Sequence, residues 1–373
     1  MKLGVVGLPN VGKSTLFNAL TRAGAPSANY PFCTIEPNVG IVSVPDERVD
    51  FLADHYKAKS VVNATIEFVD IAGLVKGAAS GEGLGNKFLS HIREVDAIVH
   101  VVRTFANQDI IHVDGDVNPV RDINTISLEL ILSDIESVGK QIDKLSKQMK
   151  SQKADSKLGE ELELLQKIKI ALENEKFAST AMQTEKEREI ARSFFLLTLK
   201  PVLYVANISE NEINSFFSST ESDVAGSLRE LIDFVHEQNN QIIGICAKIE
   251  EELGNEDDIE IRAELMQMYG MHQSGLDTLI SASYKLLGLI SYLTAGEAEV
   301  RAWTIPIGTK APGAAGKIHT DFERGFIRAE IVAYDDFKKY GNIILAKENG
   351  KVRVEGKDYV VKDGDIIHFR FNV

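Results

Sequence analysis

The 373-residue sequence predicts an α/β protein with a doubly wound, mostly parallel sheet, an inserted antiparallel helical hairpin and a small separate C-terminal domain. Apolar strand-like runs alternate with helical segments, which favours a parallel sheet covered on both faces. A long stretch between two of those runs has apolar residues spaced alternately by three and four, typical of a coiled-coil seam. From Trp303 onward, short β-like runs alternate with Gly and Pro instead.

Composition bounds the class of protein. The hydrophobic fraction of 44% is ordinary for a globular protein. No apolar run approaches the roughly 18 residues that span a membrane, and the chain begins in a strand without a signal peptide, so we expect a cytoplasmic protein. The two cysteines, Cys33 and Cys246, suggest reduced thiols and neither a disulfide framework nor a metal cluster.

The net charge of −14 argues against non-specific nucleic-acid binding by the whole molecule, so DNA is not an expected partner. The acidity is local, however. Residues 208–275 hold 15 acidic and 3 basic side chains, whereas residues 288–373 hold 12 acidic and 13 basic ones. The C-terminal region can therefore still present a basic face to RNA.

The most informative stretch is GLPNVGKS at residues 7–14, between an apolar run at 3–6 and a helical pattern at 15–23. Strand, glycine-rich turn and helix in this order are the context of a phosphate-binding loop. Loop N–H groups converge on phosphate oxygens, and the helix N-terminus adds partial positive charge. Lys13 would reach the β/γ-phosphates and the Ser14 hydroxyl would hold Mg²⁺. A nucleoside triphosphate is therefore predicted to bind Asn10, Val11, Gly12, Lys13, Ser14 and Thr15.

A second phosphate element follows in the sheet. The strand predicted at 64–69 ends in Asp70-Ile71-Ala72-Gly73, which begins 56 residues after Ser14. In this DxxG element the Asp70 carboxylate would hold Mg²⁺ through water, and the Gly73 N–H would meet the γ-phosphate. Thr34 lies in the long loop at 24–40, where it either completes the Mg²⁺ coordination or is one hydroxyl among several. Further strands are expected at 41–44, 97–102, 202–206 and 241–246, and a helix at 86–94.

Base recognition departs from the GTPase pattern. After the strand at 202–206, GTPases of this type carry Asn-Lys-x-Asp, whose Asp carboxylate accepts two hydrogen bonds from guanine. Here the sequence reads Asn207-Ile208-Ser209-Glu210, with a carboxylate one methylene longer. A misplaced acceptor leaves the guanine donors unpaired, and binding sites reject analogues most strongly in this way. We therefore predict that ATP binds in preference to GTP.

Hydrolysis needs a residue that positions water. Leu74 follows the DxxG glycine, where many GTPases place a glutamine, and an apolar side chain cannot orient water. His112, in the polar segment at 107–119, is a candidate general base or orienting group, although a lone loop histidine is often a bystander. Asn10 is a candidate ligand for a monovalent cation such as K⁺ near the β/γ-phosphates.

A helical insertion interrupts the alternating pattern. We expect an antiparallel hairpin at 125–195, whose charged outer faces are either solvated or partner-binding. Another helix is expected at 277–293, before β-like runs at 303–307, 326–331, 351–354, 359–361 and 366–371. The first seam consists of Leu128, Ile131, Ile135, Val138, Ile142, Leu145 and Met149, and the return seam of Leu158, Leu162, Leu165, Ile168 and Leu172.

Taken together, these motifs resemble those of the YchF, or Obg-like ATPase, family of TRAFAC-class P-loop NTPases. The resemblance covers essentially the whole chain. It includes YPFCTIEPN at 30–38, DIAGL at 70–74, NISE at 207–210 and APGAAGKIHTDF at 311–322. The last run is typical of that family's TGS domain, a β-grasp module. One departure is Cys246-Ala247, where the family more often has Ser-Ala.

The resemblance implies a ribosome-associated ATPase that acts in translation or stress responses. It implies that the backbone at Ile208 lies against the base and that the histidine matching His112 is catalytic together with Lys13. Expected partners are ATP, the ribosome (large subunit or 70S-type particle) and rRNA, with no membrane. The implied domains are a nucleotide-binding domain at 1–124 and 196–287, the coiled coil at 125–195 and the TGS domain at 288–373.

Three other interpretations remain open. The chain could be a nucleotide-stabilised RNA-binding module whose hydrolysis is incidental, or a GTPase of the same fold. A small-molecule P-loop kinase is disfavoured because Thr34 and Gly73 suit a γ-phosphate sensor. In the C-terminal domain, four basic side chains either meet rRNA phosphates or are solvated: Lys310, Lys317, Arg324 and Arg328.

Overall fold

The computed structural model describes residues 1–22, 38–73, 84–107, 115–151, 156–213, 216, 226–256, 258–271 and 273–372. These residues form two compact units. The first contains the described residues of 1–40 and 67–276, and the second contains those of 41–66 and 277–373. Among the described residues, none of the helices combines the length and apolar character needed to cross a bilayer.

The first sheet has six strands in the order β2-β4-β1-β5-β6-β7. Its pairs β1–β4, β1–β5, β5–β6 and β6–β7 are parallel, which confirms the predicted α/β class. The central strands are continuous apolar runs because both faces of the sheet are covered by helices. Its strands are β1 (Lys2–Val6), β2 (Val39–Ser43), β4 (Thr65–Asp70), β5 (Ala97–Arg103), β6 (Val202–Asn207) and β7 (Gln241–Ile245).

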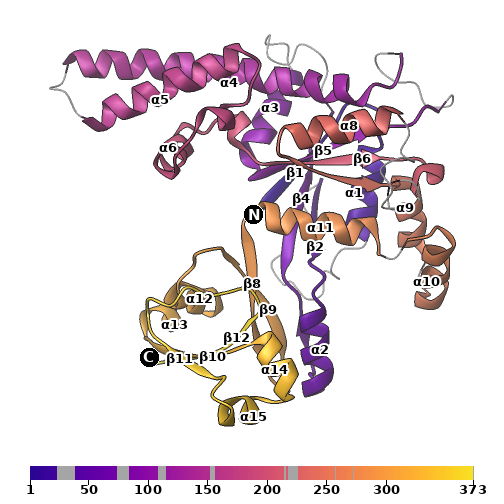
Figure 1. Cartoon of the computed structure of the whole chain (residues 1–373), viewed down its shortest axis with the longest axis vertical. Coiled ribbons are helices and arrows are strands. Elements are labelled where there is room, and N and C mark those ends of the chain that lie inside the picture. The colour runs from indigo at the N-terminus through magenta and orange to yellow at the C-terminus, as the bar shows by residue number, and fades with distance from the viewer. Residues whose placement is uncertain are drawn as a thin grey trace. The chain divides into compact units, whose positions relative to one another are not determined.

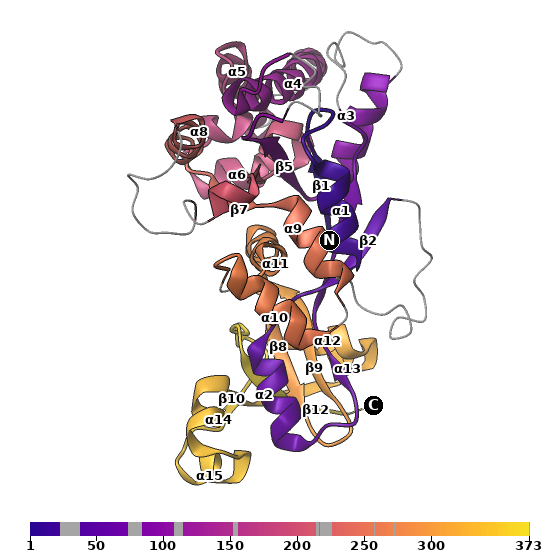
Figure 2. The same cartoon turned by 90° about the vertical axis from the view of Figure 1, so that its right-hand side faces the viewer.

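Helices cover this sheet on both faces (Figure 2). Helices α1 and α9 pack against each other, and α4 packs against α8 and β5. Because parallel strands need helical crossovers, this double layer follows from the strand order. The helices of the unit are α1 (Lys13–Arg22), α3 (Leu84–Glu94), α4 (Pro119–Ser151), α5 (Ser156–Glu173), α6 (Glu185–Ala191), α8 (Gly226–Glu237), α9 (Ala247–Asn255) and α10 (Ile259–Met268).

Helices α4 and α5 form the predicted antiparallel hairpin, drawn in magenta in Figure 1. A buried cluster that includes Ile131, Val138, Leu165 and Ile168 joins the two helices. The expected boundaries were wrong in two respects. Leu128 is 44% exposed, so the buried seam begins one turn later. After α5 the chain forms short 3₁₀ segments and α6, so the hairpin does not extend to residue 195.

The second unit is built on a six-stranded mixed sheet in the order β11-β10-β12-β8-β9-β3. One face packs on α12 through a core that includes Tyr292, Ala314 and Phe369. The strands are β3 (Val61–Val62), β8 (Leu289–Ala295), β9 (Val300–Pro306), β10 (Phe326–Ala333), β11 (Arg353–Glu355) and β12 (Asp365–Phe371). The helices are α2 (Glu47–Tyr56), α12 (Ala311–Ile318), α13 (Thr320–Arg324), α14 (Tyr334–Tyr340) and α15 (Ile343–Glu348).

Two expectations for this half of the chain were wrong. The helix predicted at 277–293 ends early, because α11 (Gly275–Leu286) is followed by Gly288 in a left-handed conformation (φ +65°) and then by β8. Residues 359–361 form only an isolated bridge, between Val360 and Lys310.

Candidate nucleotide-binding site

The phosphate-loop motif lies between β1 and α1, as its sequence predicts. Gly7 allows a close backbone approach, because a Cβ there would lie 2.7 Å from the carbonyl oxygen of Val101. Gly12 takes a left-handed conformation (φ +91°), and Asn10 has φ +65°. The Leu16 N–H donates to the Gly12 carbonyl (3.0 Å), so the helix begins directly after the turn. The first N–H groups of α1 therefore lie at the end of the loop, where a phosphate group would be bound.

Lys13 and Asp70 are brought together by the sheet. Asp70 ends β4 and pairs in parallel register with Val5 of β1. The Lys13 ammonium forms an ion pair with the Asp70 carboxylate, and the two side chains are only 10% and 20% exposed. Gly73 lies beside the loop, since a Cβ there would lie 3.4 Å from the Gly7 carbonyl oxygen. The Lys13 ammonium, the Asp70 carboxylate and Gly73 therefore lie close together at the carboxyl ends of β1 and β4.

Ser14 and Thr15 occupy the first turn of α1, with Ser14 exposed and Thr15 half-buried. Among the residues that the structure describes, no three His, Cys, Asp or Glu side chains gather as a self-sufficient metal centre. Mg²⁺ in phosphate-binding sites usually takes one or two protein oxygens and completes its shell with phosphate and water. The Ser14 hydroxyl and the Asp70 carboxylate fit that pattern. Thr34, Leu74 and His112 lie outside the described residues.

A pocket of about 360 Å³ adjoins the loop and is lined by residues that follow β5, β6 and β7. Asn207 anchors it: its Nδ2 donates to the Val11 carbonyl (2.8 Å), and its Oδ1 accepts from the Ala247 N–H (3.1 Å). The side chain is 7% exposed. Asn207 therefore ties the phosphate loop to the start of α9.

The carboxylate of Glu210 is bound to a neighbour. Lys248 Nζ donates to Glu210 Oε1 at 2.5 Å; both residues line the pocket, and their side chains are 77% and 43% exposed. Ile208 is fully buried, and its N–H donates to the Ile245 carbonyl (3.0 Å). The acceptor that would read guanine in an Asn-Lys-x-Asp motif is thus held in an ion pair.

Sequence reasoning missed the residues that line this pocket after β5. Arg103 is 1% exposed; its Nε donates to the Phe105 carbonyl (2.8 Å), and its guanidinium lies 5.0 Å from the centre of the Phe105 ring. Burial lowers the pKa of Arg103 below its usual value. A charged residue at the end of a strand that is otherwise apolar except for His100 was the available signal. Burial also raises the pKa of the Cys246 thiol, which lines the pocket at the N-cap of α9.

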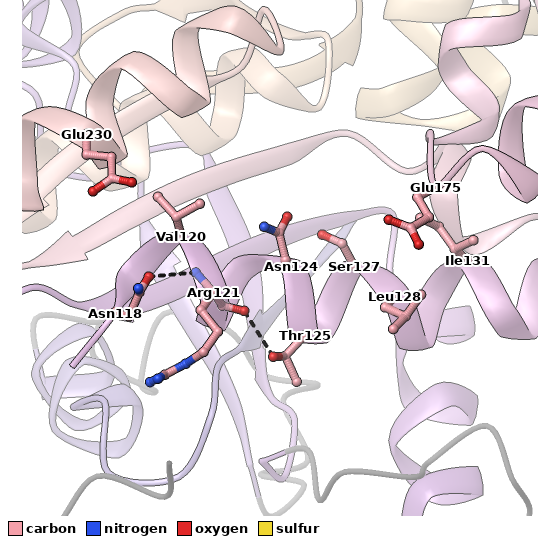
Figure 3. Close-up of a pocket in the computed structure, with 10 residues that line it drawn as sticks. All are labelled: Asn118, Val120, Arg121, Asn124, Thr125, Ser127, Leu128, Ile131, Glu175 and Glu230. Atoms are coloured by element: carbon pink, nitrogen blue, oxygen red, sulfur yellow. Dashed lines mark hydrogen bonds between the residues drawn. The ribbon is translucent and has the colours of Figure 1, made fainter. Parts of the chain in front are cut away.

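A second groove of the same unit, about 530 Å³ in volume, runs along α4 (Figure 3). Its amide and hydroxyl side chains include Asn124 and Ser127, and the carboxylates of Glu230 and Glu175 lie toward its two ends. Arg121 also lines it, with the guanidinium paired to Asp116 at 2.8 Å. Two carboxylates disfavour a triphosphate, so the pocket beside the phosphate loop is the better nucleotide site.

The fold and this site define a P-loop nucleotide-binding protein. Residues 2–158 match a family model described as 50S ribosome-binding GTPase, and residues 289–372 match the YchF-GTPase_C model, described as a protein of unknown function. The ribosome-binding ATPase YchF of Bacillus subtilis is 55% identical over 99% of both chains. That of Pasteurella multocida is 51% identical over 100% of this chain and 99% of its own.

Among solved structures, the YchF GTPase of Schizosaccharomyces pombe matches with a TM-score of 0.88 and 42% identity, over 99% of this chain and 97% of its own. The chain belongs to the YchF family.

Proposed function

We propose that this chain is a ribosome-associated ATPase, which hydrolyses ATP to ADP and phosphate and acts as a nucleotide-dependent switch in translation or stress responses. Relatives at 55% and 51% identity bear the name ribosome-binding ATPase, while the Schizosaccharomyces pombe structure and both family models carry the word GTPase. These names disagree on the base, so the preference for ATP or GTP has to follow from the residues of this chain's own pocket.

The Glu210–Lys248 ion pair carries that choice. Guanine presents N1–H and N2–H donors, which need a carboxylate acceptor. For Glu210 to accept these hydrogen bonds, its carboxylate would have to leave Lys248. Because the Glu side chain is one methylene longer than that of Asp, its carboxylate would also reach a different position. Adenine presents an amino donor beside a ring acceptor and needs no carboxylate. The pocket therefore favours ATP, because guanine would leave its donors unpaired.

We assign the binding residues by their place around the loop. Asn10, Val11, Gly12, Lys13, Ser14 and Thr15 would hold the phosphates with Gly73, and Asn207, Ile208 and Glu210 would border the base. Ser14, Asp70 and Thr34 would hold Mg²⁺, and Asn10 would help to hold K⁺. Bound Mg²⁺ supplies positive charge to the transferring phosphoryl group.

In catalysis, Lys13 would neutralise charge that develops on the β/γ-phosphate oxygens. His112 is proposed to orient the attacking water, since Leu74 cannot. Both belong to the nucleotide-binding domain, for which we propose residues 1–124 and 196–287. The helical insertion at 125–195, whose coiled-coil part is α4 and α5, and a TGS domain of β-grasp type at 288–373 are proposed to contact the ribosome, including rRNA of the large subunit or the 70S-type particle, in the cytoplasm.

The test is a titration of the full chain with fluorescent ATP and GTP analogues in Mg²⁺, with K⁺ or Na⁺. ATP should bind at least about tenfold more tightly than GTP. Equal or tighter GTP binding would contradict the assignment and favour the GTPase alternative.

A second measurement is co-sedimentation with ribosomes in each nucleotide state. Binding that differs between ATP and ADP supports a switch, since a switch needs different partner affinity in its two states. Equal binding in both states, with normal ribosome cycling of a Ser14→Ala variant, favours an RNA-binding module with incidental hydrolysis.

A further inference from the structure

The second unit carries a large groove on its sheet. Strands β10, β11 and β12 and helix α15 provide most of its lining, and its volume is about 1,060 Å³. We call it the C-terminal groove. Its volume is at the upper limit of small-molecule sites, which span roughly 300–1,000 Å³, so it suits a peptide segment better than a metabolite.

Aliphatic side chains of this groove are exposed. Ile344 is 67% exposed, Val354 63% and Ile343 42%. Ile343 and Ile344 begin α15, and Val354 lies on β11, the strand at the edge of the sheet. Soluble proteins rarely leave several aliphatic side chains exposed around one concavity unless another molecule covers them.

The charged side chains that line the groove are mostly basic. Glu330 pairs with Arg370 (Nε–Oε1 3.1 Å) and with Arg328 (3.7 Å). The hydrogen bond from Arg370 lowers the pKa of Glu330, so that carboxyl stays ionised at neutral pH. Two guanidinium groups thus share one carboxylate, and Lys347 adds a further positive charge at the wall. A partner with carboxylates beside its apolar groups would complement this surface.

The type of apolar side chain that lines the groove indicates whether its partner is a protein or an RNA. Unpaired bases bind by stacking on exposed aromatic rings. In this groove the most exposed apolar side chains are aliphatic, and the aromatic Tyr56, Phe322 and Phe371 are half-buried. Phe322 and Phe371 instead stack on each other with ring centres 3.6 Å apart, and Phe369 is 6% exposed.

We propose that the C-terminal groove binds an amphipathic helix of a partner protein, with aliphatic residues facing Ile343, Ile344 and Val354 and with Asp or Glu facing Lys347 and the arginine pair. Helix-in-groove recognition uses apolar anchors at spacings of three and four. Carboxylates in the partner's sequence would lie beside that stripe.

The probe is a phage library of random peptides about 14 residues long, enough for nearly four helical turns. It is selected on the immobilised full chain, and the strongest clone is synthesised with a fluorescent label and titrated by anisotropy. We expect enriched clones to combine a Leu, Ile, Val or Met stripe with Asp or Glu. Ile344→Glu should weaken that peptide at least about tenfold. Lys347→Glu should weaken it by repelling its carboxylates.

Ile170→Glu is the matched control, because Ile170 is an equally exposed isoleucine (62%) on α5. It should leave peptide binding unchanged. Three results would overturn the proposal: no enriched clone, clones that bind Ile344→Glu as well as the wild type, or enriched clones that are basic. A labelled single-stranded RNA that binds the wild type and is lost in Ile344→Glu, with no peptide enriched, would assign the groove to RNA.

Discussion

Replacing Gly12 by alanine tests whether Asn207 and the phosphate loop form one unit. Gly12 has φ +91°, and an added Cβ would overlap Asn207 Nδ2. A non-glycine residue in the left-handed region costs about 1–2 kcal/mol. If Asn207 moves away, its bonds to the Val11 carbonyl and the Ala247 N–H are lost, at about 1 kcal/mol each. The total is roughly 3–4 kcal/mol.

For a unit of this size, about 2–4 °C of melting temperature accompanies each kcal/mol, so Gly12→Ala should melt roughly 6–16 °C lower. Differential scanning fluorimetry measures this, and a nucleotide titration should show a loss of ATP affinity. Gly139→Ala is the control, because Gly139 lies in α4 with no atom within 4 Å of an added Cβ. Its melting temperature should stay equal or rise slightly, since alanine favours the helix.

A double mutant separates the two causes. Asn207→Ala alone should cost about 2 kcal/mol, and adding it to Gly12→Ala should cost less than the sum, by about 2 kcal/mol, because the same two bonds are lost once. If Gly12→Ala has the melting temperature and the ATP affinity of the wild type, the phosphate loop does not depend on its contact with Asn207. If the destabilisations of the two single variants add exactly in the double variant, the added Cβ does not disturb the hydrogen bonds of Asn207.

Two further predictions follow from the first unit. Lys248→Met should leave Glu210 without its ion-pair partner and reduce the ATP-over-GTP preference by up to about fivefold in a competition titration, because an exposed ion pair contributes at most about 1 kcal/mol. Lys169→Met on α5 should not change the preference, and an unchanged preference in Lys248→Met would mean that this ion pair does not select the base. His100 is buried in β5, and burial lowers its pKa from 6.5 to about 3. Because the unfolded chain binds the proton first, the folded state loses stability as the pH falls below 6.5, by about 2 kcal/mol at pH 5, until the loss levels off near pH 3. Chemical denaturation at pH 8 and at pH 5 measures this loss as the difference between the two free energies of unfolding. In His100→Leu that difference should be smaller than in the wild type by about 2 kcal/mol. An equal difference in both proteins would contradict the low pKa.

The phosphate loop was predictable because everything it needs is contiguous. Residues 7–14 contain the turn, the lysine and the hydroxyl, and the flanking runs specify the strand and the helix. For Asp70 the sequence showed only the DxxG pattern at the end of a strand, and the parallel register of that strand with Val5 of β1 is what brings the carboxylate to the loop. Local sequence therefore determines this part of the site.

The base pocket was harder, because it is assembled from the ends of β5, β6 and β7. Nothing in the sequence around Arg103 shows that its guanidinium will lie over Phe105 at the border of that pocket. The overlong helix at 277–293 has a different cause. Apolar runs of helix and buried strand are alike in pattern, and Gly288 was the only local sign of the break. That α2 groups with the second unit depends on contacts such as those of Tyr56 with Phe337, which are distant in sequence.

The Lys13–Asp70 ion pair bears on how nucleotide binding could act as a switch. On the assignment proposed above, both groups would be needed elsewhere when Mg²⁺ and a triphosphate bind, Lys13 at phosphate oxygens and Asp70 toward the metal. Binding would then break a mostly buried ion pair and would have to replace each partner's counter-charge, since leaving either charge unpaired would be costly. Asp70 leads directly into Gly73, which lies against the loop at Gly7. The γ-phosphate, which ADP lacks, is the group that could compensate for the broken ion pair, so we expect the Lys13–Asp70 contact itself to differ between the two nucleotide states.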